Sequence, residues 1–309
     1  MTFFDVHESE RPDASTVLLS AGLGGAAGYW APQLAALKAR YRVVAYDQAG
    51  TGRNKRDLPD DHSIAAMADE VLAVMDATNT DTAHFVGHAL GGLVGLDLAV
   101  RHPDRLHSLT VVNGWAAAHA HTKRCFELRL MLLKHEGPSA YVRAQPIFLY
   151  PADWLAKNAE RAAQEEAHGL SFFQGADTLK RRIAALLAFD ATPHLASLGT
   201  PTLISAARDD VLVPCSMSEQ LATSIPGATL HVAPWGAHAI NVTQPDAFNV
   251  MLLEFLGGTR ESRPPQDSKH SHATLSGRDV RGPARLTPRR RARRRSATGT
   301  RPAPRGRHR

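Results

Sequence analysis

Short apolar runs alternate with amphipathic segments over the first third of the chain. Segments that contain runs of Val, Leu and other apolar residues occupy 16–22, 41–52, 83–92 and 106–114, and segments with helical spacing of apolar positions lie between them. This alternation is typical of βαβ units that build a parallel sheet. The strand runs are almost continuously apolar, as expected of strands that helices cover on both faces.

The alternation stops near residue 116 and returns near residue 196. Between these points the sequence shows only helical periodicity, as in residues 123–135 and 177–189. We therefore expect a set of helices inserted between two strands of the sheet.

Two further segments with strand-like runs follow at residues 200–210 and 228–238, and a last amphipathic helix at 246–256 ends before Gly257 and Gly258. The fold class predicted from this order is α/β, with a mostly parallel central sheet flanked by helices and an inserted helical cap. The predicted organisation is a core in two parts, 1–115 and 196–258, a cap at 116–195 and a tail at 259–309.

Charge divides the chain at the start of that tail. Residues 259–309 hold 16 Lys and Arg against three acidic residues, which leaves 20 basic and 27 acidic residues for 1–258. The tail is rich in Pro, Gly, Ser and Arg and has few large apolar residues, so we expect it to be disordered. Its basic run at 288–296 could contact nucleic acid or anionic lipid non-specifically. A dispensable extension is the simpler interpretation, and no other nucleic-acid role is expected.

Several classes of protein are excluded by what the sequence lacks. No stretch of 18 apolar residues is free of charge, and the first residues carry acids and a proline rather than a signal peptide, so we expect no membrane span and a cytoplasmic location. Cys125 and Cys215 lie far apart and outside any CxxC pattern, which argues against a disulfide framework or a thiolate metal site. No metal and no cofactor is expected, and a homo-oligomer is left open.

The segment HFVGHALGGLVGLDL has the layout of a nucleophile elbow. A strand is followed by Gly87, two residues on by Ala89, and then by Gly91 and a helix, which matches Gly-x-Ser-x-Gly with alanine in place of serine. An alanine methyl group cannot attack a carbonyl carbon, so an acyl-enzyme at this position is chemically excluded. An ordinary helix start is the alternative interpretation, and the placement of the segments described next disfavours it.

Backbone donors for an oxyanion are expected on two segments. The loop SAGLGG is rich in small residues that allow close approach of a ligand, and it contains neither GxGxxG nor a P-loop pattern. In this fold one N–H comes from such a loop and the second from the residue after the elbow centre. Leu23 and Leu90 are the matching positions.

A carboxylate and a histidine follow in the order that this fold uses. Asp210 lies four residues before Pro214, so it fits an Asp-x-x-x-Pro spacing better than its neighbour Asp209 does. Adjacent acids at the end of a strand often form a solvated turn, which is the alternative interpretation. His238 lies in a Gly-x-His loop further on. A histidine oriented by an aspartate is a general base near neutral pH. With no serine to deprotonate, water is its expected target.

These segments together resemble one family in particular. The motifs YDQAGTG, VGHALGGLVGLDLA, QPIFLYPADW and WGAHAINVTQP, among others over about residues 15–256, are similar to those of the RutD family, the α/β-hydrolases of the pyrimidine-utilisation (Rut) pathway. The resemblance implies that the missing serine is a family trait. It also implies hydrolysis of carbamate to carbon dioxide and ammonia, or of 3-aminoacrylate to malonic semialdehyde and ammonia. Ala49 departs from the arginine that the family's DQ-x-GTG turn carries.

Both implied substrates are small nitrogenous anions, so a cation should line the pocket. Arg124 and Arg129 on the helix at 123–135 are candidates, and a solvated helix face is the alternative. His88, beside the elbow centre, is a further candidate contact. Four aromatic side chains are expected to close the pocket or to be ordinary core, namely Trp30, Trp115, Tyr150 and Trp154.

The resulting hypothesis is a hydrolase of uracil catabolism in which His238, held by Asp210, activates water while the N–H groups of Leu23 and Leu90 accept the developing charge. Two other classes stay open. A non-catalytic receptor for a small ligand would explain the lost nucleophile, and a cofactor-free oxygenase or lyase would also need only His and Asp. A serine esterase is the least favoured interpretation because it requires the missing hydroxyl.

Overall fold

The computed structural model describes residues 2–261, with side chains up to Thr259. The expected disorder of the tail at 259–309 concerns residues that lie almost entirely outside this range. Within the described part of the chain, no helix is long and apolar enough to cross a membrane. Cys125 and Cys215 are both buried free thiols.

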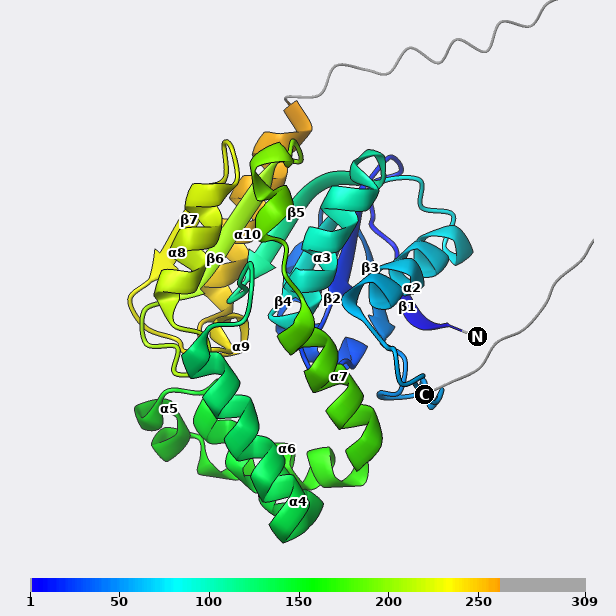
Figure 1. Ribbon diagram of the computed structural model, residues 1–309. Coiled ribbons are helices and arrows are strands. Elements are labelled where there is room, and N and C mark those ends of the chain that lie inside the picture. The colour runs from blue at the N-terminus through cyan, green and yellow to red at the C-terminus, as the bar shows by residue number, and fades with distance from the viewer. Residues whose placement is uncertain (1, 262–309) are drawn as a thin grey trace, which may run out of the picture. The chain divides into compact units, whose positions relative to one another are not determined.

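Seven strands form one sheet in the order β1-β3-β2-β4-β5-β6-β7 (Figure 1). Strand β1 is antiparallel to β3, and the other neighbouring pairs are parallel. The strands are β1 (Phe3–His7), β2 (Thr16–Ser20), β3 (Arg42–Asp47), β4 (Ala83–His88), β5 (Leu106–Val112), β6 (Thr202–Ala207) and β7 (Thr229–Ala233). This is the mostly parallel α/β sheet expected from the sequence, with β1 as an edge strand that the apolar runs did not predict.

Helices cover both faces of the sheet because side chains alternate along its strands. Val17 and Leu19 of β2 face one layer with Phe248 and Leu252, whereas Leu18 between them faces the other layer. The helices of the core are α1 (Ala31–Lys38), α2 (Ile64–Ala77), α3 (Leu90–Arg101), α8 (Cys215–Ser224), α9 (Ile240–Thr243) and α10 (Pro245–Glu261), with short 3₁₀ turns η1 (Ala27–Trp30), η2 (Pro103–Arg105) and η3 (Thr192–Ser197). The first layer holds α1 and α10, and the second holds α2, α3 and α8.

Four helices between β5 and β6 lie beyond the carboxyl ends of the parallel strands and form the cap (Figure 1). They are α4 (Ala120–Leu149), α5 (Ala152–Lys157), α6 (Ala159–Ser171) and α7 (Ala176–Ala188). Helix α4 is broken at Gly137, whose φ of 82° is non-helical, and Pro138 follows it. The inserted segment leaves and rejoins the core at one place, where Ala117 pairs with Asp190 and the Ala191 N–H donates to the Ala116 carbonyl oxygen at 2.9 Å.

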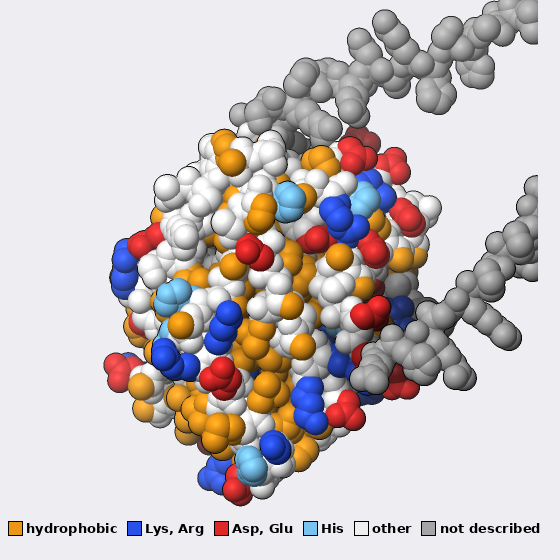
Figure 2. Space-filling model, in the orientation of Figure 1, with side chains coloured by type: hydrophobic (Ala, Val, Ile, Leu, Met, Phe, Trp, Pro, Cys, Tyr) orange, Lys and Arg blue, Asp and Glu red, His pale blue; other side chains and the backbone are white. Residues whose placement is uncertain are grey.

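Apolar side chains also reach the surface of the cap. Figure 2 shows hydrophobic side chains gathered in the lower part of the molecule, with charged side chains spread around them. The exposed large apolar residues of the cap are Leu128, Met131, Ile147, Leu170 and Phe172. The cap therefore presents a less polar surface than its charged sequence runs alone would predict.

Candidate active site

The turn between β4 and α3 holds Ala89 in a left-handed backbone conformation, with φ of 45° and ψ of −111°. A Cβ atom on Gly87 would lie 2.2 Å from the carbonyl oxygen of Gly91, and one on Gly91 would lie 2.3 Å from that of Ser20. Both positions therefore require glycine, and the sharp turn has the geometry of a nucleophile elbow. The methyl group of Ala89 stands where that motif carries its nucleophile.

Two backbone N–H groups lie at the same end of the cavity. Leu23 belongs to the loop that follows β2, which we call the oxyanion loop (residues 21–25), and Leu90 is the first residue of α3; both line the cavity. The N–H of a first helical residue has no partner inside its own helix. Within residues 2–261, neither N–H donates to another backbone group. Two donors placed together in this way can stabilise a developing oxyanion.

A cap residue forms hydrogen bonds with the oxyanion loop. Arg182 of α7 is fully buried, and its Nη2 donates to the carbonyl oxygen of Leu23 at 3.3 Å and to the side-chain oxygen of Gln48. Burial lowers the pKa of Arg182 to about 10, against the opposing effect of the Glu70 carboxylate. The guanidinium therefore stays charged at neutral pH, which places a positive charge beside the oxyanion loop.

The sequence analysis did not single out Arg182, although a signal was present. Its helix carries buried apolar residues at Leu179, Ile183 and Leu186, and Arg182 lies at i+3 and i−4 to two of them. Those spacings put the arginine on the apolar face of the helix rather than on the solvated one. A charge on a buried face needs acceptors, and the carbonyl groups of the oxyanion loop supply them.

His238 and Asp210 form a buried pair. His238 Nδ1 and Asp210 Oδ2 lie 2.7 Å apart, and the second carboxylate oxygen accepts from the N–H groups of Leu212 and Val213 at 2.8 and 2.9 Å. Asp209 instead accepts from a backbone N–H of the histidine loop. Because Nδ1 of His238 is bonded to the carboxylate, Nε2 is the nitrogen left for water or substrate on the cavity side.

Asn113 fixes the loop that carries this histidine. It follows β5 with a φ of 49°, its Nδ2 donates to the His238 carbonyl oxygen at 2.6 Å, and its Oδ1 accepts from the Ala207 N–H at 3.1 Å. Asn113 was not singled out from the sequence. The available signal was the Asn-Gly pair at the end of a strand, because asparagine tolerates positive φ better than most residues.

His88 lies between the histidine loop and the oxyanion loop. Its Nε2 contacts the His238 carbonyl oxygen at 2.8 Å, so this nitrogen carries the proton and Nδ1 is an acceptor. Burial, together with the nearby His238, lowers the pKa of His88 to about 3. The Nδ1 atom is buried and has no partner among the described residues. His88 is therefore neutral at physiological pH and offers one unused acceptor.

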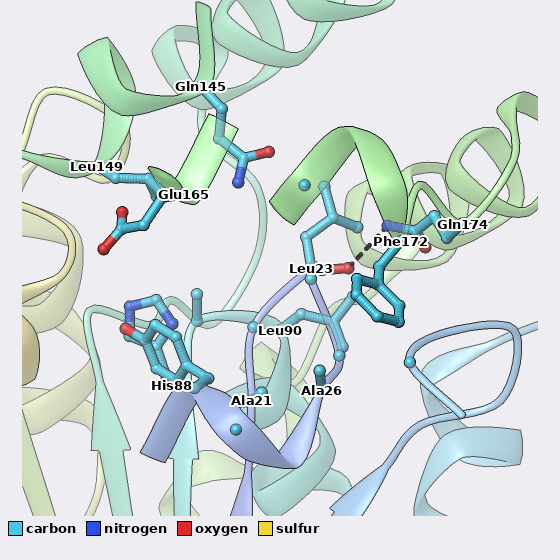
Figure 3. A pocket seen from close by; sticks show the side chains of 18 of the residues that line it. Ala21, Leu23, Ala26, His88, Leu90, Gln145, Leu149, Glu165, Phe172 and Gln174 are labelled. Carbon is cyan, nitrogen blue, oxygen red and sulfur yellow. Dashed lines mark hydrogen bonds between the residues drawn. The ribbon is translucent and has the colours of Figure 1, made fainter. Parts of the chain in front are cut away.

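Leu23, Leu90 and the histidines 88 and 238 line one cavity of about 750 Å³ between the sheet and the cap, whereas Asn113, Arg182 and Asp210 lie behind its wall. Figure 3 shows Ala21, Leu23, Leu90 and His88 on the core side, with Gln145 of α4 across the open space from them. The walls between the two sides are mostly apolar and include Trp115, Phe126, Tyr141, Leu149, Phe173 and Leu186. A cavity of this kind excludes bulk water and strengthens electrostatic interactions inside it.

The two candidate arginines of α4 have different positions. Arg129 is buried and lines the cavity, whereas Arg124 is exposed and does not line it. Five residues along an α-helix correspond to a rotation of about 140° from the starting direction, so the two side chains cannot share a face. The expectation that Arg124 binds substrate is therefore wrong.

Of the four aromatic candidates, Trp115 and Tyr150 line the cavity. The Tyr150 hydroxyl donates to Glu165 Oε2 at 2.6 Å, and its ring stacks on Trp154 at 4.5 Å between centroids. Trp30 is fully buried in the layer of α1 and α10, which makes it core. Within the range that the structure describes, no group of three or more His, Cys, Asp or Glu residues is arranged to hold a metal ion.

Comparison with known proteins shows the family and the fold of this chain. The profile of the alpha/beta hydrolase fold matches residues 15–135. A candidate carbamate hydrolase named RutD from Caulobacter sp. (strain K31) is 52% identical over 83% of this chain and 96% of its own length. The chain belongs to the RutD family. A second RutD, from Rhizobium rhizogenes, is 48% identical over 84% of this chain and 99% of its own length.

Solved structures place this RutD-family chain among α/β hydrolases. A hydrolase from Pseudomonas aeruginosa PA01 superposes with a TM-score of 0.75 at 28% identity, covering 82% of this chain and 93% of that one. An enol-lactonase from Burkholderia xenovorans LB400 gives the same TM-score at 25% identity, covering 83% and 96% of the two chains. The family resemblance inferred from the sequence motifs is thus confirmed, and so is the fold class.

Proposed function

We propose that this RutD-family hydrolase acts in pyrimidine catabolism by hydrolysing carbamate with a histidine-activated water in place of an acyl-serine intermediate. The observation that carries the proposal is the buried His238–Asp210 pair next to an elbow whose central residue is Ala89. Burying a carboxylate beside a histidine costs free energy of desolvation, and two backbone N–H groups and Asn113 hold this pair in place. Proton transfer is the function that accounts for such an arrangement. The names of the curated relatives support carbamate as the substrate.

The first step is the attack of water. Asp210 holds His238 in the tautomer whose Nε2 is unprotonated, so this nitrogen takes a proton from a water molecule in the cavity. The oxygen of that water forms a bond to the carbamate carbon. The N–H groups of Leu23 and Leu90 donate to a substrate oxygen, where negative charge accumulates as the carbon becomes tetrahedral.

The second step releases ammonia. The His238 imidazolium returns its proton to the substrate nitrogen, the carbon–nitrogen bond breaks, and bicarbonate, the hydrated form of carbon dioxide, remains. The balance is one carbamate and one water to one bicarbonate and one ammonia. The Asp210 carboxylate stabilises the imidazolium between the two proton transfers, and the neutral His88 adds no competing positive charge.

3-Aminoacrylate is the second candidate substrate. Its imine tautomer offers a carbon that the same activated water can attack, and loss of ammonia then leaves malonic semialdehyde. The volume of the cavity supports it as a candidate because this acid is longer than carbamate. The two substrates need the same groups in the same order, so kinetic comparison is required to rank them.

The test is ammonia release from freshly prepared carbamate and 3-aminoacrylate, measured against the uncatalysed background. We expect the wild type to accelerate at least one reaction and His238→Ala to abolish the acceleration, because removal of a general base costs about 10²- to 10⁴-fold. Asp210→Asn should lower the rate strongly without unfolding the protein. His135→Ala, an exposed histidine outside the cavity, is the matched control.

Two rival functions give different results in the same experiment. If the wild type accelerates neither reaction but binds the substrates, the chain is a small-ligand receptor. If it consumes oxygen with a bound substrate and releases no ammonia, it is a cofactor-free oxygenase. Acceleration that survives in His238→Ala would overturn the proposed role of the dyad while leaving a hydrolase in place.

A further inference from the structure

Two arginines are buried between the sheet and the cap, and their surroundings differ. Arg182 directs its guanidinium at protein acceptors, which are the carbonyl groups of residues 22, 23 and 49 and the side chain of Gln48. Arg129 has only two acceptors, the Tyr141 hydroxyl at 2.6 Å and Gln145 Oε1 at 3.4 Å, and its Nη2 makes both bonds. Both terminal nitrogens of Arg182 have protein acceptors and only its Nε lacks one among the described residues, whereas Arg129 lacks acceptors at Nε and at Nη1.

Three of the five N–H donors of Arg129 therefore lack an acceptor among the described residues. The Nε atom is buried without a partner, and neither hydrogen of Nη1 makes a hydrogen bond. The described residues also provide no carboxylate within ion-pairing distance of this guanidinium. A buried cation with unused donors is costly unless something else supplies the acceptors.

Three aromatic rings surround the guanidinium of Arg129. The guanidinium carbon lies 5.0 Å from the Tyr141 ring centroid, 5.3 Å from Phe126 and 5.5 Å from Phe148. These rings stabilise the charge and fix the plane of the guanidinium. Because Nη2 already donates to Tyr141 and Gln145, Nη1 is the nitrogen left at the end of the guanidinium, and a carboxylate oxygen can accept a charge-assisted hydrogen bond from it.

The position of this group in the cavity sets the length of its ligand. Arg129 bonds to Gln145, which faces the core side across the open cavity in Figure 3, while His238 and the oxyanion donors lie on that core side. The cavity has a volume of about 750 Å³, in the range of pockets that enclose drug-sized molecules. Carbamate has four heavy atoms and leaves most of that space unused.

We propose that the cap side of the cavity is a carboxylate site built on Arg129, and that the cavity binds monocarboxylic acids whose carboxylate is separated from the catalytic end by an apolar segment. The carboxylate pairs with Arg129, and the apolar segment lies against Phe126, Leu149 and Phe173. This ligand class goes beyond the small substrates of the proposed function. It does not depend on which of them is hydrolysed.

The test is calorimetric titration of the full chain with straight-chain acids from acetate to octanoate and with the primary alcohols of equal length. We expect the affinity for acids to rise about fourfold for each added methylene, because each buried CH₂ contributes that factor, until the cavity is filled. The matched alcohols should bind at least tenfold more weakly. Acids and alcohols that bind equally well, or acids that do not bind, would overturn the proposal.

Variants identify the residue that carries the preference. Arg129→Met should lower acid affinity about 10- to 100-fold and leave alcohol affinity unchanged, since hydrogen bonds to a charged group are lost while the apolar walls stay. Arg124→Met removes the same charge from the same helix outside the cavity and should change neither. Arg129→Lys keeps the positive charge and removes the planar guanidinium, so it should retain part of the preference for acids. A preference for acids that persists in Arg129→Met would assign it to another group.

The result is separable from the fate of the proposed function. Ammonia release can fail while acids still bind through Arg129, which would leave the carboxylate site intact and remove only the hydrolase. Conversely, carbamate hydrolysis with no discrimination between acids and alcohols would remove only the carboxylate site. A melting curve for each variant checks that the cap stays folded.

Discussion

Ala89 combines a strained backbone with an inert side chain. A non-glycine residue at positive φ costs about 1–3 kcal/mol, and a turn that serves only to start a helix has no reason to accept this cost. The same conformation presents the side chain of residue 89 to the cavity that His238 also lines. The elbow therefore keeps the geometry of nucleophilic catalysis without the nucleophile.

This geometry predicts the result of restoring the hydroxyl. Ala89→Ser should convert the chain into an esterase that gives a burst of p-nitrophenol from p-nitrophenyl acetate and retains one acetyl group on residue 89, because the base and the oxyanion donors are already in place. Intact-protein mass spectrometry detects the adduct. Ala89→Ser combined with His238→Ala is the control and should show neither burst nor adduct. An Ala89→Ser protein that folds but does not acylate would mean that His238 does not reach this side chain.

Individual site residues were predictable to different degrees. Order along the chain and local motif were sufficient for Asp210 and His238, and the structure brings the two together. The choice between Asp209 and Asp210 depended only on distance from Pro214. Helical geometry alone shows that Arg124 and Arg129, five residues apart, cannot both face the cavity. The sequence does not show which of the two faces it.

Among the elements, α7 couples the cap to the oxyanion loop through Arg182. We expect Arg182→Met to lower kcat about tenfold with a smaller change in KM. Arg182 does not contact the substrate in this proposal; it donates to the carbonyl oxygens of Gly22 and Leu23, so its loss shifts the peptide groups that position the Leu23 N–H. Arg181→Met is the matched control, since that arginine pairs with Asp60 on the surface. Steady-state kinetics and a melting curve of both variants provide the check. Equal effects of the two variants on kcat would refute the coupling.

The elements themselves were largely predictable, and the exceptions have physical causes. Strands β2 to β6 are buried, so their apolar runs are distinct in the sequence, whereas β1 is a half-buried edge strand that pairs only with β3. Helix α4 extends beyond the periodic segment at 123–135. Its two helical stretches meet at a kink at Gly137, whose backbone is non-helical, and the second stretch ends at Leu149. The contacts of Arg182 reach residues more than 130 positions away, and no local pattern contains such information.

At the scale of the whole molecule, the buried His88 and the half-buried His62 make the stability depend on pH. Burial lowers the pKa of His88 to about 3 and that of His62 to about 4, and the nearby positive charge of Arg182 adds to the effect at His62. The unfolded chain takes up protons at these groups below about pH 6.5. The folded state is therefore favoured fully above that pH and loses stability as the pH falls toward the lower pKa values.

We expect the free energy of unfolding, from urea titrations at pH 7, 6 and 5, to fall by up to about 1.4 kcal/mol per pH unit for the buried His88, and by less for the half-buried His62, whose charge is partly screened by solvent. His62→Gln should flatten this slope, and the exposed His135→Gln should not. Carboxylates whose pKa is lowered, such as Asp47 with its Arg53 partner, contribute a stability that is complete above about pH 4 and is lost only below it, which is outside this window. A slope that is the same in His62→Gln and the wild type would contradict the assignment for that residue.

The single crossing point of the cap, where residues 116 and 117 meet 190 and 191, bears on how such enzymes diversify. One continuous stretch of coding sequence can be replaced there without altering the pairing of any strand, so recombination between relatives offers an easy route to new specificity. The route is constrained by Arg182, because the incoming segment must supply an equivalent donor to the Leu23 carbonyl oxygen. Chimeras should therefore have the specificity of the parent that supplies the cap, and they should retain turnover only when the new cap carries an arginine equivalent to Arg182.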